Sequence, residues 1–188
     1  MPVSRKAVKR KEATRQPMNS KEAALTSCIV EAWPAGFGNH LFGACGLPIP
    51  APGVRANARV PATDIAWREF DLITDRFETN EEWCRLIVEL KNGGLGYRSM
   101  SQVIFYKHAL VPRHTNFFDA SRFIFVAIGK QPNPKRWHGD GVLESDAVAF
   151  LELLSERCWP DPDVYAFSYQ QLGLLWSANE QAWSWSIA

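Results

Sequence analysis

The sequence predicts an α+β fold in a single domain: a mainly antiparallel sheet with about three helices and a C-terminal β-hairpin. Three observations lead to this fold class. Segments with helix caps and helical spacing alternate with segments of strand-like spacing. Residues 183–187, Trp-Ser-Trp-Ser-Ile, alternate apolar and polar side chains with a period of two, as in a half-buried strand. Apolar residues make up 46% of the 188, with eight Trp and eleven Phe, which is enough to build a core around large rings.

The N-terminal residues 1–19 are predicted to be a basic, flexible tail ahead of a domain at 20–188. Through Lys21 the chain carries seven basic residues and one acidic residue, a net charge of +6, whereas the whole protein has +1. Such a segment is suited to nucleic-acid phosphates, to an acidic protein surface or to nuclear import, and it can also be a solvated tail. The basic residues of this predicted arm are Arg5, Lys6, Lys9, Arg10, Lys11 and Arg15.

The first helix is expected at 21–32, with Ser20 as its N-cap and Pro34 as its end. From Pro34 to Pro61 the chain holds five Pro and five Gly. This composition predicts a long irregular loop at 34–62. Such loops in compact domains are uncommon and are usually functional or mobile.

The middle of the chain contains one expected helix between two ambiguous segments. Residues 64–77 fit a strand or a helix. A helix is predicted from about Thr79 to Asn92, with acidic residues in its first turn and Gly93 at its end. Residues 99–110 again fit either state. If they are helical, 81–110 is a helix-turn-helix that would present Arg98, Ser99 and Gln102 to base edges.

The C-terminal half is predicted to begin with a buried strand at 122–128. A helix follows from about 145 to 157, and alternation resumes at Tyr165. The phase slips by one near Gln170, which indicates a bulge or a break. The final hairpin is predicted to have its turn at 178–181. The face that carries Trp183, Trp185 and Ile187 is expected to be buried in the core.

The most polar cluster is Arg136-Trp-His-Gly-Asp140. His138 and Asp140 suit a general base with its orienting carboxylate, or two metal ligands with His114 as a third. Ordinary loop chemistry also accounts for Gly139-Asp-Gly141, so these residues are only weak metal candidates. The sequence contains no GxSxG, P-loop or HExxH motif.

Four cysteines, Cys28, Cys45, Cys84 and Cys158, lack the spacing of a zinc knuckle or a disulfide framework and are expected to be free thiols. No apolar run approaches the about 20 residues of a membrane span. We therefore expect a cytoplasmic protein, or a nuclear one in a eukaryote, with no membrane partner and no cofactor.

Composition favours a non-catalytic interaction protein, similar in size and character to small inhibitors or immunity proteins. Its acidic, aromatic-rich body would bind another protein or complex through Arg136, Trp137 and Trp159, while the basic arm contacts nucleic acid or an acidic patch. Two alternatives stay open: a DNA- or RNA-binding protein, and a small metal-dependent or His/Asp hydrolase.

Overall fold

The computed structural model describes most of the N-terminal half of the chain and both ends of the C-terminal half. The described residues are 20–47, 49–61, 67–79, 82–96, 102, 103, 106, 122–130 and 163–187.

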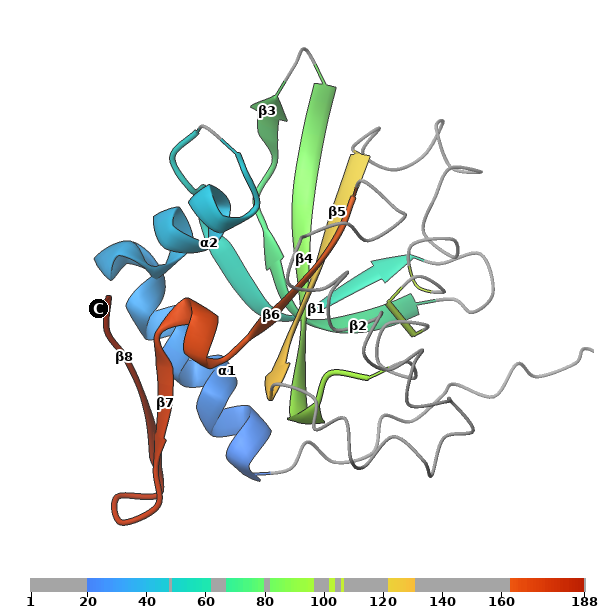
Figure 1. Cartoon of the computed structure of the whole chain (residues 1–188). Coiled ribbons are helices and arrows are strands. Elements are labelled where there is room, and N and C mark those ends of the chain that lie inside the picture. The colour runs from blue at the N-terminus through green and yellow to red at the C-terminus, as the bar shows by residue number, and fades with distance from the viewer. Residues whose placement is uncertain are drawn as a thin grey trace, which may run out of the picture.

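A six-stranded mixed sheet forms the centre of the molecule (Figure 1). Its strand order is β1-β2-β4-β5-β6, with the short β3 paired to the beginning of β4. β1, β2 and β4 pair antiparallel, as do β3 and β4, whereas β5 is parallel to both β4 and β6. The strands are β1 (Val54–Pro61), β2 (Trp67–Thr74), β3 (Phe77–Thr79), β4 (Glu82–Gly94), β5 (Arg122–Lys130) and β6 (Val164–Ser168).

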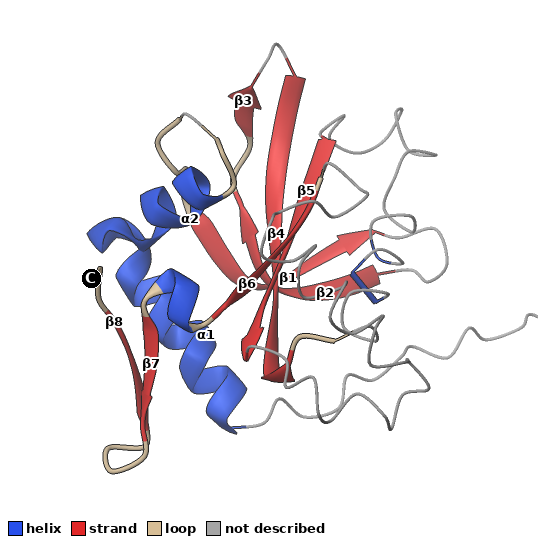
Figure 2. Cartoon of the chain, in the orientation of Figure 1, coloured by secondary structure: helices blue, strands red, loops and turns tan. Residues whose placement is uncertain are grey.

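One kinked helical segment lies against one face of this sheet (Figure 2). It comprises α1 (Ser20–Ala32), a π-helical turn η1 (Trp33–Phe37) and α2 (Gly38–Ala44). Gly36 has φ 125°, a left-handed conformation that favours glycine, and it lies where the two helices meet. Pro34, expected to end the helix, instead opens this turn.

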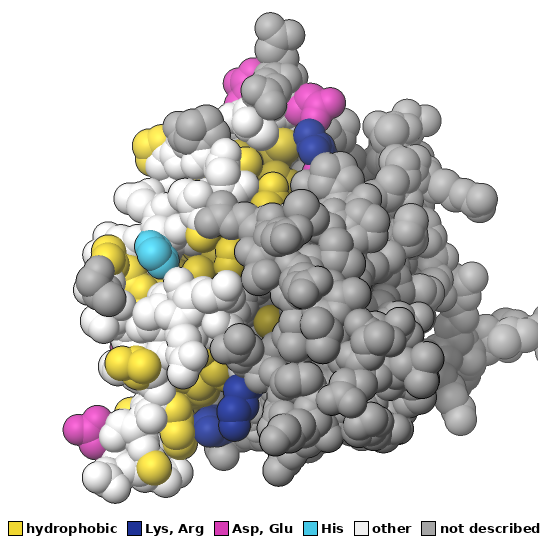
Figure 3. All heavy atoms as spheres, viewed as in Figure 1, with side chains coloured by type: hydrophobic (Ala, Val, Ile, Leu, Met, Phe, Trp, Pro, Cys, Tyr) yellow, Lys and Arg dark blue, Asp and Glu magenta, His cyan; other side chains and the backbone are white. Residues whose placement is uncertain are grey.

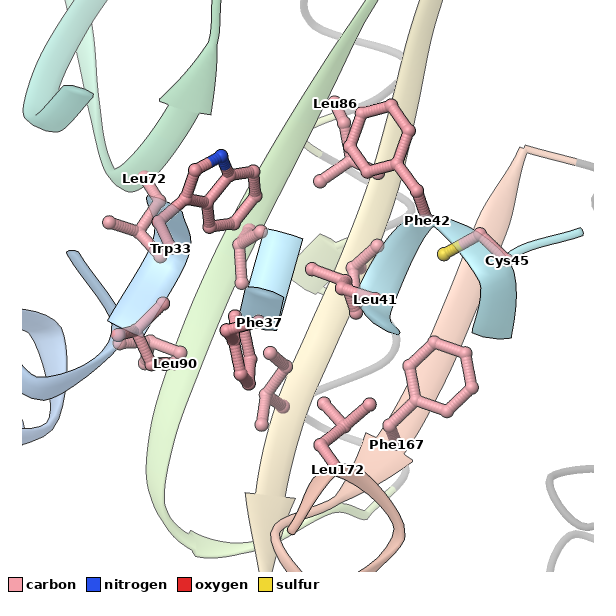
Figure 4. Packing of buried hydrophobic residues seen from close by; sticks show 14 of the residues in the cluster. Trp33, Phe37, Leu41, Phe42, Cys45, Leu72, Leu86, Leu90, Phe167 and Leu172 are labelled. Atoms are coloured by element: carbon pink, nitrogen blue, oxygen red, sulfur yellow. The ribbon is translucent and has the colours of Figure 1, made fainter. Parts of the chain in front are cut away.

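The larger core fills the space between the helical segment and the sheet (Figure 4). Leu25, Ile29, Trp33, Phe37 and Leu41 recur every fourth residue and are all buried, so they form one stripe facing the sheet. Figure 4 shows Trp33, Phe37 and Leu41 of this stripe pointing toward the strands. The strands contribute Leu72, Leu86, Val88, Leu90, Ile124, Val126 and Ile128.

A second core lies on the opposite face of the sheet. Phe70, Ile87 and Phe125 are its large strand side chains, and the helical residue Val103 packs among them. The central strands β4 and β5 therefore bury side chains on both faces.

The C-terminal segment returns to the helical layer. After β6, a 3-10 turn η3 (Gln170–Leu172) leads into a separate two-stranded sheet of β7 (Leu174–Ser177) and β8 (Ala182–Trp185). The Trp185 indole N–H donates to the Leu172 carbonyl at 3.0 Å, and its ring meets Phe37 at 5.7 Å. The predicted strand at 165–169, the break near Gln170 and the hairpin are confirmed, and Trp183 and Trp185 pack against the core. Ile187, expected on the same face, is 65% exposed.

The predicted fold class is wrong in two respects. The sheet is mixed and not mainly antiparallel, because β5 pairs in parallel with both of its neighbours. Strands outweigh helices, and in the described chain only the 20–44 segment supplies helices of two turns or more, not about three separate ones. The strand at 122–128 is confirmed as β5, whereas the helix expected at 145–157 lies outside the described residues.

The helix predicted from Thr79 to Asn92 is instead the long strand β4. Its segment Leu86-Ile-Val-Glu-Leu90 is almost continuously apolar because β4 is buried on both faces. Such a run has no period-two alternation and is easily taken for a helix. The ambiguous segment 64–77 contains strand β2, and Gln102, Val103 and Tyr106 are helical.

The irregular loop predicted at 34–62 is also wrong for most of its length. It contains η1, α2 and the whole of β1. Only the stretch around 45–53 lacks regular structure among its described residues. There the Trp33 indole donates to the Pro52 carbonyl at 2.8 Å, and the Ala51 amide donates to Asn39 at 2.8 Å.

Candidate functional site: a carboxylate–lysine cluster on the central sheet

Two carboxylates occupy facing positions where β2 and β4 separate. The two strands pair at Leu72 with Val88 and at Ile73 with Ile87. Continuing this register by one position brings Asp71 opposite Glu89, just beyond the paired residues. Asp71 is fully buried, and its Oδ2 accepts a hydrogen bond from the Leu90 amide at 2.7 Å. The Asp71 carboxylate is therefore fixed by the backbone of the facing strand.

Glu89 and Lys91 lie two residues apart on β4, so both side chains project from the same face of the sheet. Lys91 Nζ lies 2.9 Å from Glu89 Oε1. The side chains of Lys91 and Glu89 are only 17% and 12% exposed. On the parallel neighbour β5, the residue beside Glu89 is the buried Ala127.

A helical residue holds the lysine from a second direction. Lys91 Nζ donates to Gln102 Oε1 at 3.0 Å, and Gln102 Nε2 donates in turn to the Tyr106 hydroxyl. The Tyr106 ring packs edge-on against Phe70 at 5.5 Å, and the Arg68 guanidinium lies 4.6 Å from its centroid. The carboxylate–lysine cluster is thus Asp71, Glu89 and Lys91, with Gln102 and Tyr106 orienting the lysine.

This donor set suits a divalent cation and a phosphate together. Mg²⁺ is typically held by one or two carboxylates while water and substrate phosphates complete its shell. A nearby ammonium group suits the remaining phosphate charge. Within the described residues no group of three or more His, Cys, Asp or Glu gathers at one point, so a metal here would depend on the two carboxylates, water and substrate.

A purely structural role explains the cluster less well. A buried ion pair adds little to stability, because the cost of removing both charges from water offsets their attraction. Asp71 has an evident structural use. Its carboxylate accepts a hydrogen bond from the Leu90 amide, just beyond the residues through which β2 and β4 pair. The side chains of Glu89 and Lys91 instead contact each other, and Lys91 also contacts Gln102.

The backbone of the site is tied to the C-terminal segment by Tyr169. The Tyr169 hydroxyl donates a hydrogen bond to the Lys91 carbonyl, at the point where the register between β4 and β5 shifts. Burial, reinforced by Glu22, raises the pKa of Tyr169 above its ordinary value of 10.0. The hydroxyl therefore keeps its proton, and the donor function, at neutral pH.

None of the residues predicted from the sequence for the basic arm, the partner site or the metal site can be placed in this cluster. They lie outside the described residues: Arg5, Lys6, Lys9, Arg10, Lys11, Arg15, His114, Arg136, Trp137, His138, Asp140 and Trp159. Cys28, Cys45 and Cys84 are free thiols, as predicted, and Cys158 is outside the described residues. Burial raises the pKa of the Cys28 and Cys84 thiols, which keeps them protonated and poorly reactive.

The helix-turn-helix hypothesis for 81–110 is wrong, because its first helix is strand β4. Gln102, assigned there to base readout, is helical but bonds to Lys91 and Tyr106. Arg98 and Ser99 lie outside the described residues.

The sequence did contain a signal for the cluster: a carboxylate and a lysine two residues apart, Glu89-Leu-Lys91, at the end of an apolar run. On a helix these two side chains would point in different directions, because only residues three or four apart are neighbours. Taking 79–92 as a helix therefore hid the pair.

No helix in the described part of the chain is both long and apolar enough to cross a membrane. No protein-family model matches the chain, and no curated protein or solved structure matches it. Its function is therefore inferred from its own residues.

Proposed function

We propose that this protein hydrolyses phosphodiester bonds in nucleic acid with the help of a divalent metal ion, at the carboxylate–lysine cluster. The observation that carries the proposal is the position of Asp71 opposite Glu89, with Lys91 Nζ 2.9 Å from the Glu89 carboxylate. This function combines the two alternatives that the sequence left open, nucleic-acid binding and metal-dependent hydrolysis. The proposed site is on the central sheet, however, and not at His138 and Asp140.

Each residue has a role that follows from its contacts. Asp71 and Glu89 would hold the metal ion, and Asp71 is already fixed by the Leu90 amide. A metal ion held there would supply Lewis-acid polarisation of a phosphate oxygen. Lys91 would hold a non-bridging phosphate oxygen or the attacking water, and Gln102 keeps its ammonium in place. A water oxygen would then bond to phosphorus as the water gives up one proton to the solvent, one P–O ester bond would break, and the leaving oxygen would take up a proton from the solvent.

The charge of the N-terminal segment supports nucleic acid as the substrate. Residues 1–21 carry a net charge of +6, and the rest of the chain is net negative. Lysine and arginine on a segment of this kind release counterions from the nucleic-acid backbone, which provides affinity without sequence readout. A small phosphate ester would gain nothing from such an arm.

A non-catalytic interaction protein is the second candidate. In the described chain it is supported by the exposed ring of Trp83 at the start of β4, which is 47% exposed beneath the Arg76 guanidinium. Tryptophan and arginine are enriched at interface hot spots. This function predicts binding to another protein without any dependence on Glu89 or on metal ions.

Cleavage assays test the proposed function. The full chain is incubated with single-stranded DNA, duplex DNA and RNA, with Mg²⁺ or Mn²⁺ and separately with EDTA. We expect cleavage only with metal, and a loss of about 100-fold or more in Asp71→Asn. Asparagine keeps an oxygen that can accept from the Leu90 amide, so this variant tests charge and not folding. Absence of cleavage of all three substrates with either metal contradicts the proposal.

A further inference from the structure

A lysine and two indole rings form a cluster where α1 begins and the β7–β8 hairpin lies beside it. Lys21 Nζ is 4.3 Å from the Trp176 ring centroid and 5.7 Å from that of Trp183. The two tryptophans face each other across the β7–β8 ladder, with centroids 5.4 Å apart. Figure 3 shows basic side chains next to hydrophobic ones in this part of the surface.

The two rings differ in how firmly they are held. The Trp183 indole donates to the Lys21 carbonyl at 3.1 Å, and its ring packs on Tyr169 at 4.6 Å. Trp183 is thereby anchored to both α1 and the segment after β6. Trp176 is the outer ring, on a strand next to an exposed turn, and is only partly buried. Its π-face is the surface that Lys21 covers.

Tyr169 links the two tryptophans to the strand that carries the carboxylate–lysine cluster. Tyr169 touches Trp183 with its ring and donates to the Lys91 carbonyl with its hydroxyl. One tyrosine side chain therefore spans the distance between the tryptophans and the backbone of the candidate catalytic strand. The Lys91 side chain itself lies on the opposite face of the sheet, with Gln102 and Tyr106, so the tyrosine joins the two clusters through the backbone and not across one surface.

We propose that Trp176 is a stacking site for an unpaired base of single-stranded nucleic acid, with Lys21 as its phosphate contact. The inference rests on the proposed function and names its substrate class. A base would take the place of the Lys21 ammonium on the indole face, and the ammonium would move to the adjoining phosphate. Stacking of this kind tolerates any sequence, because every base has a π-face.

Charge selects this occupant over a cationic one. Aromatic clusters also bind ammonium groups of peptides, but here Lys21 already supplies a positive charge and would repel a second. Lys21 is the last of the seven basic residues in the first 21. The basic segment therefore leads directly into the aromatic cluster, which suits a polyanion carrying bases.

Binding without chemistry tests the stacking site. The full chain is titrated in EDTA into a fluorescein-labelled 20-mer of thymidylate, and the anisotropy gives Kd. We expect Trp176→Ala to raise Kd about tenfold and Trp176→Tyr to restore most of the affinity. Lys21→Gln is expected to flatten the log–log salt dependence by about 0.7, the value for one single-strand phosphate contact.

Trp83→Ala is the matched control. Trp83 also has a cation over its ring, Arg76 at 4.7 Å, but it lies at the start of β4 beside β3. The Kd of the Trp83→Ala variant for the thymidylate 20-mer is expected to stay within about twofold of the wild-type value. A 20-base-pair duplex has no free base to stack, so its affinity should be the same for wild type and Trp176→Ala.

An unchanged Kd for Trp176→Ala on the single strand overturns the stacking site, as does an equal effect of Trp83→Ala. If Trp176→Ala lowers the melting temperature, Trp176→Leu, which keeps apolar volume without a π-face, takes its place. The assay contains no metal, so its failure is separate from that of the proposed function. Tight binding that depends on Trp176, without any cleavage, would support the stacking site and contradict the proposed hydrolase function.

Discussion

The hydroxyl of Tyr169 donates a hydrogen bond to the backbone carbonyl of Lys91, joining residues 78 positions apart in the sequence. This bond satisfies a carbonyl at the point where the β4–β5 register shifts. Through the ring of the same tyrosine, the C-terminal hairpin is coupled to the strand that carries Glu89 and Lys91. The tyrosine thus supports both the fold and the candidate site.

Replacing Tyr169 by Phe removes this donor and leaves the ring packing in place. Because a buried carbonyl then loses its partner, we expect the free energy of unfolding to fall by about 1–3 kcal/mol. Urea denaturation of the variant and of the wild-type protein measures this change in the free energy of unfolding. An unchanged midpoint would show that the Lys91 carbonyl does not depend on this hydroxyl.

Alkaline pH should weaken the fold through the same residue. Burial raises the pKa of Tyr169 above 10.0 in the folded state, so the folded protein holds this proton more tightly than the unfolded chain does. The resulting stability is fully present below the unfolded pKa and is lost as pH rises from about 10 through the folded value. The raised thiol pKa values of Cys28 and Cys84 have the same effect, so these residues also make the fold less stable as the pH rises above about 9. We therefore expect unfolding curves of Tyr169→Phe to show a shallower loss of stability above pH 10 than wild type, and equal slopes would contradict this.

Trp185→Ala should be strongly destabilising. It removes a ring packed on Phe37 and Gly36 and leaves the Leu172 carbonyl without its indole donor. We expect a loss of about 3 kcal/mol or more, and truncation before Gln181, which removes β8, to unfold the protein. Ile187→Ala is the control, because Ile187 is 65% exposed and should cost under about 0.5 kcal/mol. A normal melting temperature for Trp185→Ala would show that this ring is not part of the core.

Deleting residues 1–19 should leave the free energy of unfolding within about 1 kcal/mol of the full chain, because a polar tail buries little apolar surface. The same deletion should weaken nucleic-acid binding and flatten its salt dependence by several units of slope. Anisotropy titrations at four salt concentrations measure both effects. Equal salt slopes for the two proteins would show that residues 1–19 make no phosphate contacts.

His138 and Asp140 are expected to be ordinary loop residues. Alanine at either position should change the free energy of unfolding by less than about 0.5 kcal/mol and leave metal-dependent cleavage in place. A stoichiometric metal ion that is lost in either variant would return the candidate site to this segment.

Local signals predicted the first helix, the strand β5 and the C-terminal hairpin. The first helix was found from its cap at Ser20, and the C-terminal hairpin from its period of two. β4 was missed because burial on both faces removes the period of two and because the acidic residues and the glycine at its ends resemble helix caps. β1 was missed because Pro and Gly around it resemble a loop. The parallel pairing of β5 depends on contacts between distant segments, which no local pattern records.

The candidate site was missed for the same reason. Asp71 becomes meaningful only when the register places it opposite Glu89, eighteen positions along the chain. Gln102 reaches Lys91 only because the helical residues after β4 fold back over this face of the sheet. Both relationships are tertiary, whereas the Glu89-Leu-Lys91 spacing alone was visible in the sequence.

The most direct test of the proposed function is the single-turnover cleavage rate of a single-stranded oligonucleotide in Mg²⁺, compared between Glu89→Gln and Glu78→Gln. Both variants neutralise one glutamate on a strand of the same sheet, but Glu78 is exposed on β3, away from Asp71. We expect Glu89→Gln to lower the rate about 100-fold or more, and Glu78→Gln to match wild type. Equal rates for the two variants, with both proteins folded, would contradict a catalytic role for the carboxylate–lysine cluster.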